Sequence, residues 1–182
     1  MIKKILITLA SLVLSTQLVA NEMQEHAEHE SFYVVVKALQ TVGDDVDHEG
    51  VTLKGDTGYG FGIDIGYPIA NGFSIEYDFS YSENTVDEPI ESADATYMTH
   101  ALDLEYTQHI THEFGVFVKA GFEYEKEEIN DFNIDNDSYG YVAGIGLEYV
   151  VAAHYNLLLE YEHSTIESPR GDSIDFGVMY KF

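Results

Sequence analysis

The chain has 182 residues, with 33 acidic against 8 basic side chains and a formal net charge of −25. This charge excludes nucleic acid and anionic lipid headgroups as direct electrostatic partners. The chain contains no cysteine, which excludes a disulfide framework. Its length suits a single domain.

Residues 1–20 have the features of a secretory signal peptide. Lys3 and Lys4 precede an apolar stretch over residues 5–14, and Ala20 provides a small residue at the expected cleavage site. The stretch is shorter than the roughly 20 residues that a spanning helix needs. Residues 21–31, NEMQEHAEHES, are polar and acidic and are predicted to be a flexible lead-in. We therefore expect the folded domain to occupy residues 32–182.

Eight stretches of the exported part alternate apolar and polar side chains, which is typical of half-buried β-strands. They cover residues 32–41, 57–67, 73–82, 96–106, 113–125, 139–149, 155–165 and 173–182. The connections alternate between short turns and longer polar segments, and the prolines Pro68, Pro89 and Pro169 are expected between strands. This order predicts an antiparallel up-and-down meander with its long loops, 42–56, 83–95, 126–138 and 166–172, at one end.

The two faces of these strands indicate which side meets lipid. Glycines crowd the polar face, where they would weaken a water-exposed strand but would leave room in a narrow lumen. The apolar face carries aromatic residues at both ends and aliphatic residues between them, the pattern of a membrane barrel. A soluble barrel with an apolar interior is the alternative. We predict an all-β, eight-stranded antiparallel up-and-down transmembrane β-barrel.

The end of the chain is consistent with closure of such a barrel. The last ten residues, SIDFGVMYKF, alternate up to the final aromatic residue. Lipid offers no partner for backbone N–H and C=O groups, so a sheet in the membrane must have no edge. The last strand is therefore expected to pair with the first along its full length, with Phe182 in the aromatic belt at the short-turn end.

The segment LLLEYEHST…SIDFGVMYKF resembles the final hairpin of the small outer-membrane β-barrel family, which includes opacity-type adhesins and the transmembrane domain of outer-membrane protein A. The residues that carry this resemblance are Glu160, Tyr161, Gly177, Tyr180 and Phe182. It implies a place in the outer membrane of a Gram-negative envelope, with both mature termini periplasmic. It also implies that the barrel-assembly machinery reads Tyr180 and Phe182, and that the barrel contacts lipid and lipopolysaccharide. We expect a monomer.

The inward face is predicted to hold a large excess of acids. The ten acids are Asp64, Glu76, Asp78, Asp103, Glu105, Glu123, Glu148, Glu160, Glu162 and Asp175. Only Lys37, Lys119 and Lys181 oppose them on that face. Buried charges are costly unless they are paired, so some carboxylates must be hydrated, protonated or bound to a cation. Either a salt-bridged plug or a narrow cation-selective path fits this pattern.

The external loops are acidic as well. The run NDFNIDND places Asp131, Asn133, Asp135 and Asp137 at alternate positions, but it lacks the glycine and the closing glutamate of a calcium loop. A solvated loop is the preferred interpretation, and loose divalent bridging to lipopolysaccharide is an alternative. The basic residues of these loops, Lys54, Lys126 and Arg170, are expected to be accessible to trypsin.

The histidines do not indicate a metal site, because the spaced pairs His26/His29 and His109/His112 lie in polar segments without further ligands. A lipid A hydrolase would need a serine and a base on one face. His163 and Ser164 are adjacent in the seventh strand and so should point to opposite faces. We therefore predict no enzyme and no cofactor.

These features predict a structural or surface-interaction role through acidic external loops and an unknown extracellular ligand. A narrow cation-selective porin is the alternative, and a lipid A-modifying hydrolase is a remote one.

Overall fold

The structure is a computed structural model that describes residues 32–48, 50–89 and 91–182. The predicted signal peptide (1–20) and acidic lead-in (21–31) lie outside the described residues. No helix within the described ranges is long and apolar enough to cross a membrane.

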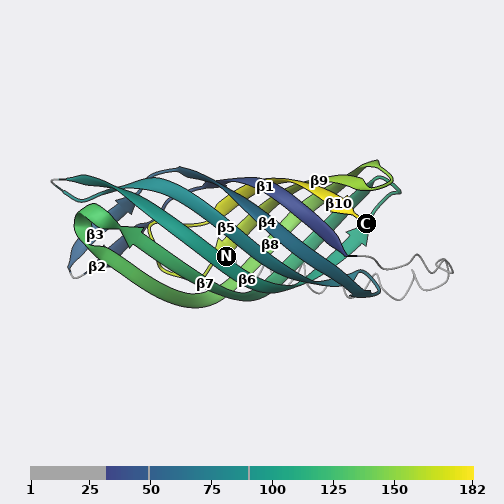
Figure 1. Cartoon of the computed structure of the whole chain (residues 1–182), viewed down its shortest axis with the longest axis horizontal. Helices are drawn as coiled ribbons and strands as arrows, with labels where there is room; N and C mark the ends of the chain where they lie inside the picture. Colours follow the sequence, from purple (N-terminus) through teal and green to yellow (C-terminus); the bar gives the residue numbers. More distant parts are fainter. Residues whose placement is uncertain (1–31, 49, 90) are drawn as a thin grey trace, which may run out of the picture.

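Eight antiparallel strands close into a barrel (Figure 1). They are β1 (Tyr33–Thr41), β4 (Gly58–Ala70), β5 (Phe73–Asp87), β6 (Ser92–His109), β7 (Phe114–Ile129), β8 (Ile134–Ala152), β9 (Tyr155–Ser164) and β10 (Ser173–Lys181). Each strand pairs with its neighbours in sequence, and β1 pairs with both β4 and β10. The predicted fold class is confirmed, since all eight alternating stretches are strands of one closed sheet.

Closure joins the two ends of the chain. The register of β1 and β10 runs from Tyr33 opposite Lys181 to Thr41 opposite Ser173, so the last strand pairs with the first along its full length. The Phe182 N–H donates to the carbonyl oxygen of Phe32 at 3.3 Å, and the two rings stack with centroids 4.1 Å apart. The expected pairing of the terminal strand is therefore confirmed.

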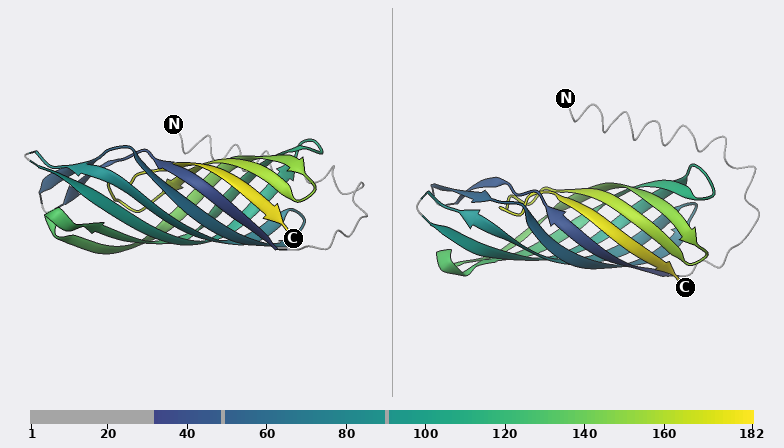
Figure 2. Two further views of the ribbon diagram at one scale, coloured as in Figure 1. Left: turned by 45° about the horizontal axis from the view of Figure 1, so that its top comes forward. Right: turned by 90° about the horizontal axis from the view of Figure 1, so that it is seen from above.

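The strands extend further at one end than the sequence pattern predicts (Figure 2). β5 and β6 remain paired as far as Asp87 opposite Ser92, and β7 and β8 as far as Ile129 opposite Ile134. Most of the predicted loops 83–95 and 126–138 is therefore strand. The latter connection contains only the short helix η1 (Asn130–Phe132) and Asn133, whose φ of 55° is left-handed.

The first long connection also contains sheet. β2 (Asp45–His48) and β3 (Val51–Gly55) form a hairpin whose second strand pairs with β5. At the opposite end the short turns are as expected, except that Pro68 lies within β4. The pairing of β4 with β1 ends at Gly66, so the missing N–H of Pro68 leaves no gap in that ladder.

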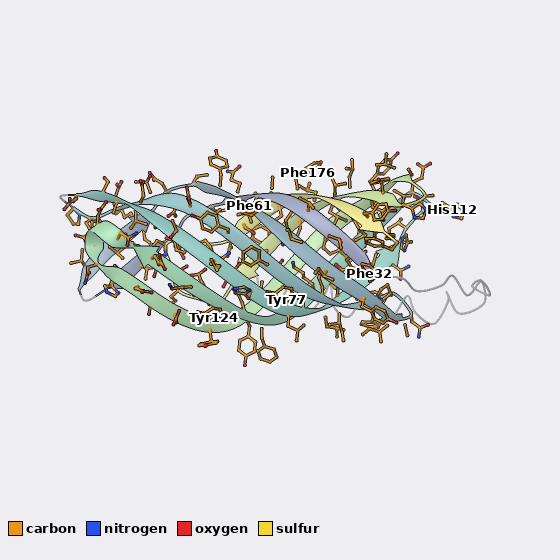
Figure 3. The ribbon with its side chains drawn as sticks, viewed as in Figure 1. Phe32, Phe61, Tyr77, His112, Tyr124 and Phe176 are labelled. Carbon is orange, nitrogen blue, oxygen red and sulfur yellow. The ribbon has the colours of Figure 1, made fainter. Side chains whose placement is uncertain are left out.

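The outer surface is apolar along the barrel (Figure 3). Phe61, Phe122, Leu102, Leu104 and Phe176 are all at least half exposed. Exposed aromatic residues gather at the two ends of this surface, with Tyr67, Tyr149 and Tyr155 at the turn end and Tyr59, Tyr139 and Tyr141 at the other. The glycines of the eight barrel strands lie on the inward face, where a Cβ on Gly62 would come 2.6 Å from the Lys37 side chain.

Candidate functional site

All ten acids predicted on the inward face are buried in the barrel interior. Their exposed fractions range from 2% at Asp64 and Asp103 to 9% at Glu162. The other members are Glu76, Asp78, Glu105, Glu123, Glu148, Glu160 and Asp175. Strand alternation explains this placement, because every second residue of a strand points to the same side.

Two lysines form the centre of the interior charge network. Lys37 Nζ lies 3.0 Å from Asp64 and 3.5 Å from Asp175, and it donates a hydrogen bond to Asp78. Lys119 Nζ lies 2.9 Å from both Glu160 and Glu162, 3.3 Å from Asp78 and 3.9 Å from Glu76. Asp78 therefore links the two lysines, and carboxylates from β4, β5, β9 and β10 share two positive charges.

An apolar cluster crosses the lumen on the turn side of this network. It contains Tyr33, Val35, Phe117, Leu158 and Met179. β7, which carries Phe117, is four strands from β1 around the ring of eight, so the cluster joins opposite walls. Between this cluster and the lysine network lies a cavity of about 10 Å³, lined in part by Val35, Lys37 and Asp175. A cavity of that size holds at most about one water molecule.

Polar groups at the turn end are paired with one another. Glu148 accepts hydrogen bonds from Asn156 and, at 2.9 Å, from Lys181. Glu105 accepts from Thr107 at 2.9 Å and from Ser74 at 3.3 Å. Unlike Lys37 and Lys119, Lys181 has a side chain that is 39% exposed, so it lies at the mouth of the lumen.

Loop 166–172 folds into the other mouth of the barrel, which the sequence did not predict. Arg170 is 3% exposed; its Nη2 lies 2.7 Å from Glu123 Oε1 and its Nε 2.5 Å from Glu125 Oε2. The expectation that trypsin would reach Arg170 is therefore wrong. Lys54 is exposed and Lys126 half-buried.

Backbone and side-chain hydrogen bonds hold this loop in place. The N–H groups of Val42, Gly43 and Asp44 donate to the carbonyl oxygens of Asp172, Arg170 and Pro169 at 2.8, 3.0 and 3.3 Å. Asn84 Nδ2 also donates to the Pro169 carbonyl at 2.9 Å. Gly43 has a φ of 78°, and a Cβ there would overlap the backbone of Gly55. The fit thus depends on glycine at this position.

A second apolar cluster lies beyond Arg170, at the end of the barrel opposite the short turns. It is built from Leu53, Val86, Ala93, Ala95, Tyr97 and Ile129, with Phe132 and Ile134 packed against it. Glu127 lies next to this cluster, opposite Tyr97 in the β6–β7 ladder. Burial, together with repulsion from Glu125, raises the pKa of Glu127 to about 7.

The end of the barrel opposite the short turns carries exposed acids on its outer side. They are Asp44, Asp45, Asp47, Asp56, Glu83, Glu91, Asp94, Asp131, Asp135 and Asp137. The run NDFNIDND does not form a calcium loop, because Asp135 and Asp137 lie in β8 opposite Glu128 and Lys126. In Figure 3 the labelled Tyr124, whose hydroxyl donates to Asp137 at 2.8 Å, lies toward this end.

His163 and Ser164 bind different partners on opposite faces. His163 Nδ1 lies 2.7 Å from Asp172 Oδ1 on the outside, where Tyr161 also donates to Asp172. Ser164 Oγ donates inward to Glu123 Oε2 at 2.5 Å. This arrangement agrees with the predicted alternation and does not pair the serine with the histidine as nucleophile and base.

The last residues lie at the turn end of the barrel. The Tyr180 ring meets Phe182 edge to face, with centroids 4.8 Å apart, and it also contacts Tyr155 at 5.1 Å. Figure 3 shows Phe32, which stacks on Phe182, at the same end as His112. The two residues expected to act as an assembly signal thus form one aromatic group with Phe32, the residue just before β1.

An apolar outer wall between two aromatic belts, a charged interior and a sheet without an edge define the class of transmembrane β-barrels. The chain belongs to the family described as outer membrane protein beta-barrel domain, which matches residues 6–182. No curated protein sequence matches it significantly.

Solved structures show the same fold at low sequence identity. Neisserial surface protein A has a TM-score of 0.65 and 19% identity over 83% of this chain and 97% of that chain. OprG from Pseudomonas aeruginosa has a TM-score of 0.63 and 16% identity over 84% and 96% of the two chains. Ail from Yersinia pestis, in complex with the heparin analogue sucrose octasulfate, has a TM-score of 0.58 and 16% identity over 85% and 100%. The chain is thus similar to small outer-membrane barrels.

Proposed function

We propose that this outer-membrane barrel is a closed scaffold that presents an acidic surface to the outside of the cell. The observation that carries the proposal is the external extension of β5 to β8, which bears exposed acids as far as η1. In barrels of this class short turns face the periplasm and longer segments face outward. We therefore place the short turns and both mature termini in the periplasm, after removal of the predicted signal peptide.

The charge of the external end favours a basic partner. Opposite charge accelerates association, whereas like charge is repelled. The Ail structure contains a sulfated ligand, but the net charge of −25 on this chain favours the opposite class of ligand. The partner proposed here is a cationic surface. Contact with lipopolysaccharide through divalent ions, and reading of the last strand by the barrel-assembly machinery, belong to the same proposal.

Binding of a basic probe tests this role. With the protein in nanodiscs, we expect fluorescence anisotropy of labelled hexalysine to report binding that weakens with salt. Neutralising Asp131, Asp135 and Asp137 to Asn should weaken it, whereas Glu113→Gln at the turn end serves as the control. If the neutralised variant bound hexalysine as well as the parent, the external surface would not be the site.

The porin alternative is distinguished by conductance. The two apolar clusters, the lysine network and Arg170 all lie across the lumen, and this argues for a closed barrel. We expect no steady current in planar lipid bilayers. A steady cation-selective current would instead favour the narrow porin. The hydrolase alternative would require acyl release that is lost in a His163→Ala variant.

A further inference from the structure

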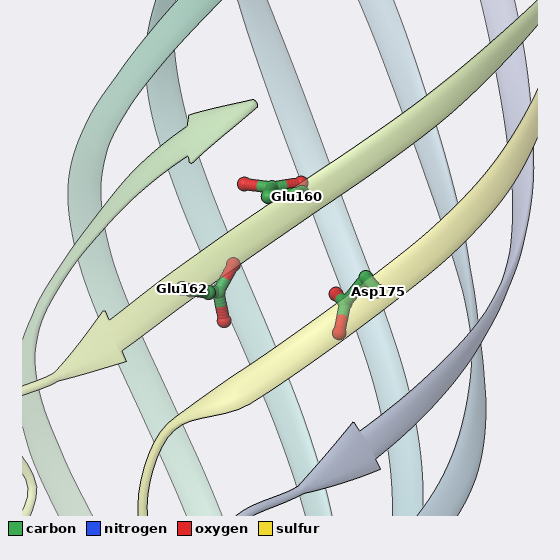
Figure 4. A group of neighbouring side chains, drawn as sticks. All are labelled: Glu160, Glu162 and Asp175. Atoms are coloured by element: carbon green, nitrogen blue, oxygen red, sulfur yellow. The ribbon is translucent and has the colours of Figure 1, made fainter. Parts of the chain in front are cut away.

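The strands around the barrel end at different heights, and this leaves one of them with a free edge. β9 ends at Ser164, just beyond Glu162 in Figure 4. The pairing of β8 with β9 begins at Val142 opposite Ser164, whereas the pairing of β8 with β7 extends as far as Ile134. In the described part of the chain, residues 134–140 of β8 are therefore paired with a strand on one side only.

The backbone groups of every second residue in this segment point to its unpaired side. The Tyr141 carbonyl accepts a hydrogen bond from the Thr165 N–H at 2.9 Å, and the Tyr141 N–H donates to Thr165 Oγ1 at 2.8 Å. Both groups of Tyr141 thus point away from β7. Hydrogen-bonded positions alternate along an antiparallel strand, and the register with β7 continues here without a bulge. The N–H and C=O groups of Asp135, Asp137 and Tyr139 therefore point to the free edge.

Loop 166–172 limits the free edge on the side of the short turns. A Cβ on Gly140 would come 2.6 Å from the Ile166 side chain, so the loop occupies the space beside Gly140. Further from the short turns, Asn136 is exposed although it lies on the inward face of β8, and Ser138 is half-buried. Both of these inward side chains are polar and neutral. The edge along residues 134–139 is therefore accessible to another chain.

The outer face of this edge is acidic. Asp135 and Asp137 point outward from β8, and Glu128 points outward from β7 opposite Asp135. The one lysine that these three carboxylates share on this face of the β7–β8 hairpin is Lys126, whose Nζ lies 3.8 Å from Asp135 Oδ1. Tyr139, two residues from Asp137 on the same face, is 80% exposed. This face therefore favours cationic side chains, which an acidic surface attracts and an exposed aromatic ring can bind.

We propose that the edge of β8 along residues 134–139 binds an extended peptide segment of an extracellular protein, which adds to the sheet as a further strand. The segment carries Lys or Arg at every second position. These basic side chains lie beside Asp135, Asp137 and Tyr139, and the neutral residues between them lie on the side of Asn136 and Ser138. A second copy of this chain fits less well, because its own edge would bring like charges together. This inference rests on the proposed function, which places this end of the barrel outside the cell.

Amide hydrogen exchange of the protein in nanodiscs tests the edge. The probe is a heptapeptide of alternating lysine and threonine. We expect it to slow exchange about tenfold at the amides of Asp135, Asp137 and Tyr139, because each gains a hydrogen bond. The amides of Asn136 and Ser138 already point to β7 and should change little. The control is the same peptide with N-methyl groups on alternate residues, which keeps the charge but cannot pair with a strand edge.

A matched pair of variants separates backbone pairing from charge. Asp137→Asn and Asp137→Pro remove the same carboxylate, but only the proline also removes the N–H that points to the free edge. The ladder with β7 does not use this N–H, so the strand should tolerate proline there. We expect Asp137→Pro to bind the labelled heptapeptide about tenfold more weakly than Asp137→Asn in fluorescence anisotropy. Heat-modifiable mobility on gels verifies folding, and if the proline variant does not fold, the N-methylated peptide gives the same comparison on the parent protein.

Equal binding of the methylated and unmethylated peptides, or equal protection of all the amides over residues 135–139, would overturn the proposal. A dimer in detergent that Asp137→Pro dissociates would also overturn it, because the edge would then pair with a second copy. Hexalysine binding, measured in parallel, reports the acidic surface without strand pairing. Failure of the edge is therefore distinguishable from failure of the proposed function.

Discussion

Arg170 is the residue whose removal should cost the barrel most at the mouth opposite the short turns. The change Arg170→Met keeps a long side chain but leaves Glu123 and Glu125 buried without their cation, at 3% and 1% exposure. Removing one partner of a buried ion pair typically costs about 3–5 kcal/mol, because an uncompensated charge remains. Since two carboxylates lose their partner here, we expect a loss of unfolding free energy at the upper end of that range.

Urea titration in detergent, followed by gel mobility, measures this loss. The triple variant Arg170→Met/Glu123→Gln/Glu125→Gln removes all three charges together and should recover most of the stability, since replacing a whole buried ion cluster is often neutral. Hydrogen exchange at the amides of Val42, Gly43 and Asp44, which donate to the loop, should accelerate in the single variant. A single variant within about 1 kcal/mol of the parent would show that the carboxylates do not need Arg170.

Three further predictions concern other parts of the barrel. Because the pKa of Glu127 rises from 4.5 to about 7 on folding, the stability it contributes is highest below pH 4.5 and falls until pH 7. Glu127→Gln should abolish this fall, worth up to roughly 3 kcal/mol, in urea titrations at several pH values. Phe182→Ala should lower the outer-membrane yield on immunoblots several-fold but barely change refolding in detergent, whereas lipid-facing Phe176→Ala should leave the yield intact. Gly66→Ala places a Cβ in the ring of Tyr33 and should cost about 1–3 kcal/mol in unfolding free energy, with rescue by Tyr33→Leu; no loss would mean that the ring moves aside.

The number of strands could be predicted from sequence because apolar alternation is strong where one face meets lipid. The ends of the strands could not be predicted in this way. Beyond the aromatic belt at the end opposite the short turns, both faces of β7 carry charged side chains. Glu125 and Glu127 point inward while Lys126 and Glu128 point outward, so the hydropathy contrast disappears although the strand continues. The only sequence pattern that could have indicated the extension of β7 is an alternation with a period of two residues in which both the inward and the outward side chains are charged.

The inward position of the ten acids could also be predicted from the alternation of the strands. The residues that form ion pairs with these acids could not be predicted in full. Arg170 lies in a loop without periodicity, and its approach to Glu123 and Glu125 depends on the docking of that loop against Gly43 and Asn84. Only the predicted excess of seven negative charges indicated that another cation was needed. Contacts between residues more than 40 positions apart, such as Arg170 with Glu125, are set by the closed barrel as a whole.

The interior is closed at two levels in series, and this bears on conductance. The closure at the loop end consists of loop 166–172 with the apolar cluster around Tyr97. The inner closure, nearer the short turns, consists of the cluster that joins Tyr33 and Phe117. Opening one level leaves the other in place, with the lysine network between them. Release of the loop in Arg170→Met should therefore not produce a current by itself. If it did, the inner cluster would have to be permeable, and the scaffold interpretation of the lumen would fail.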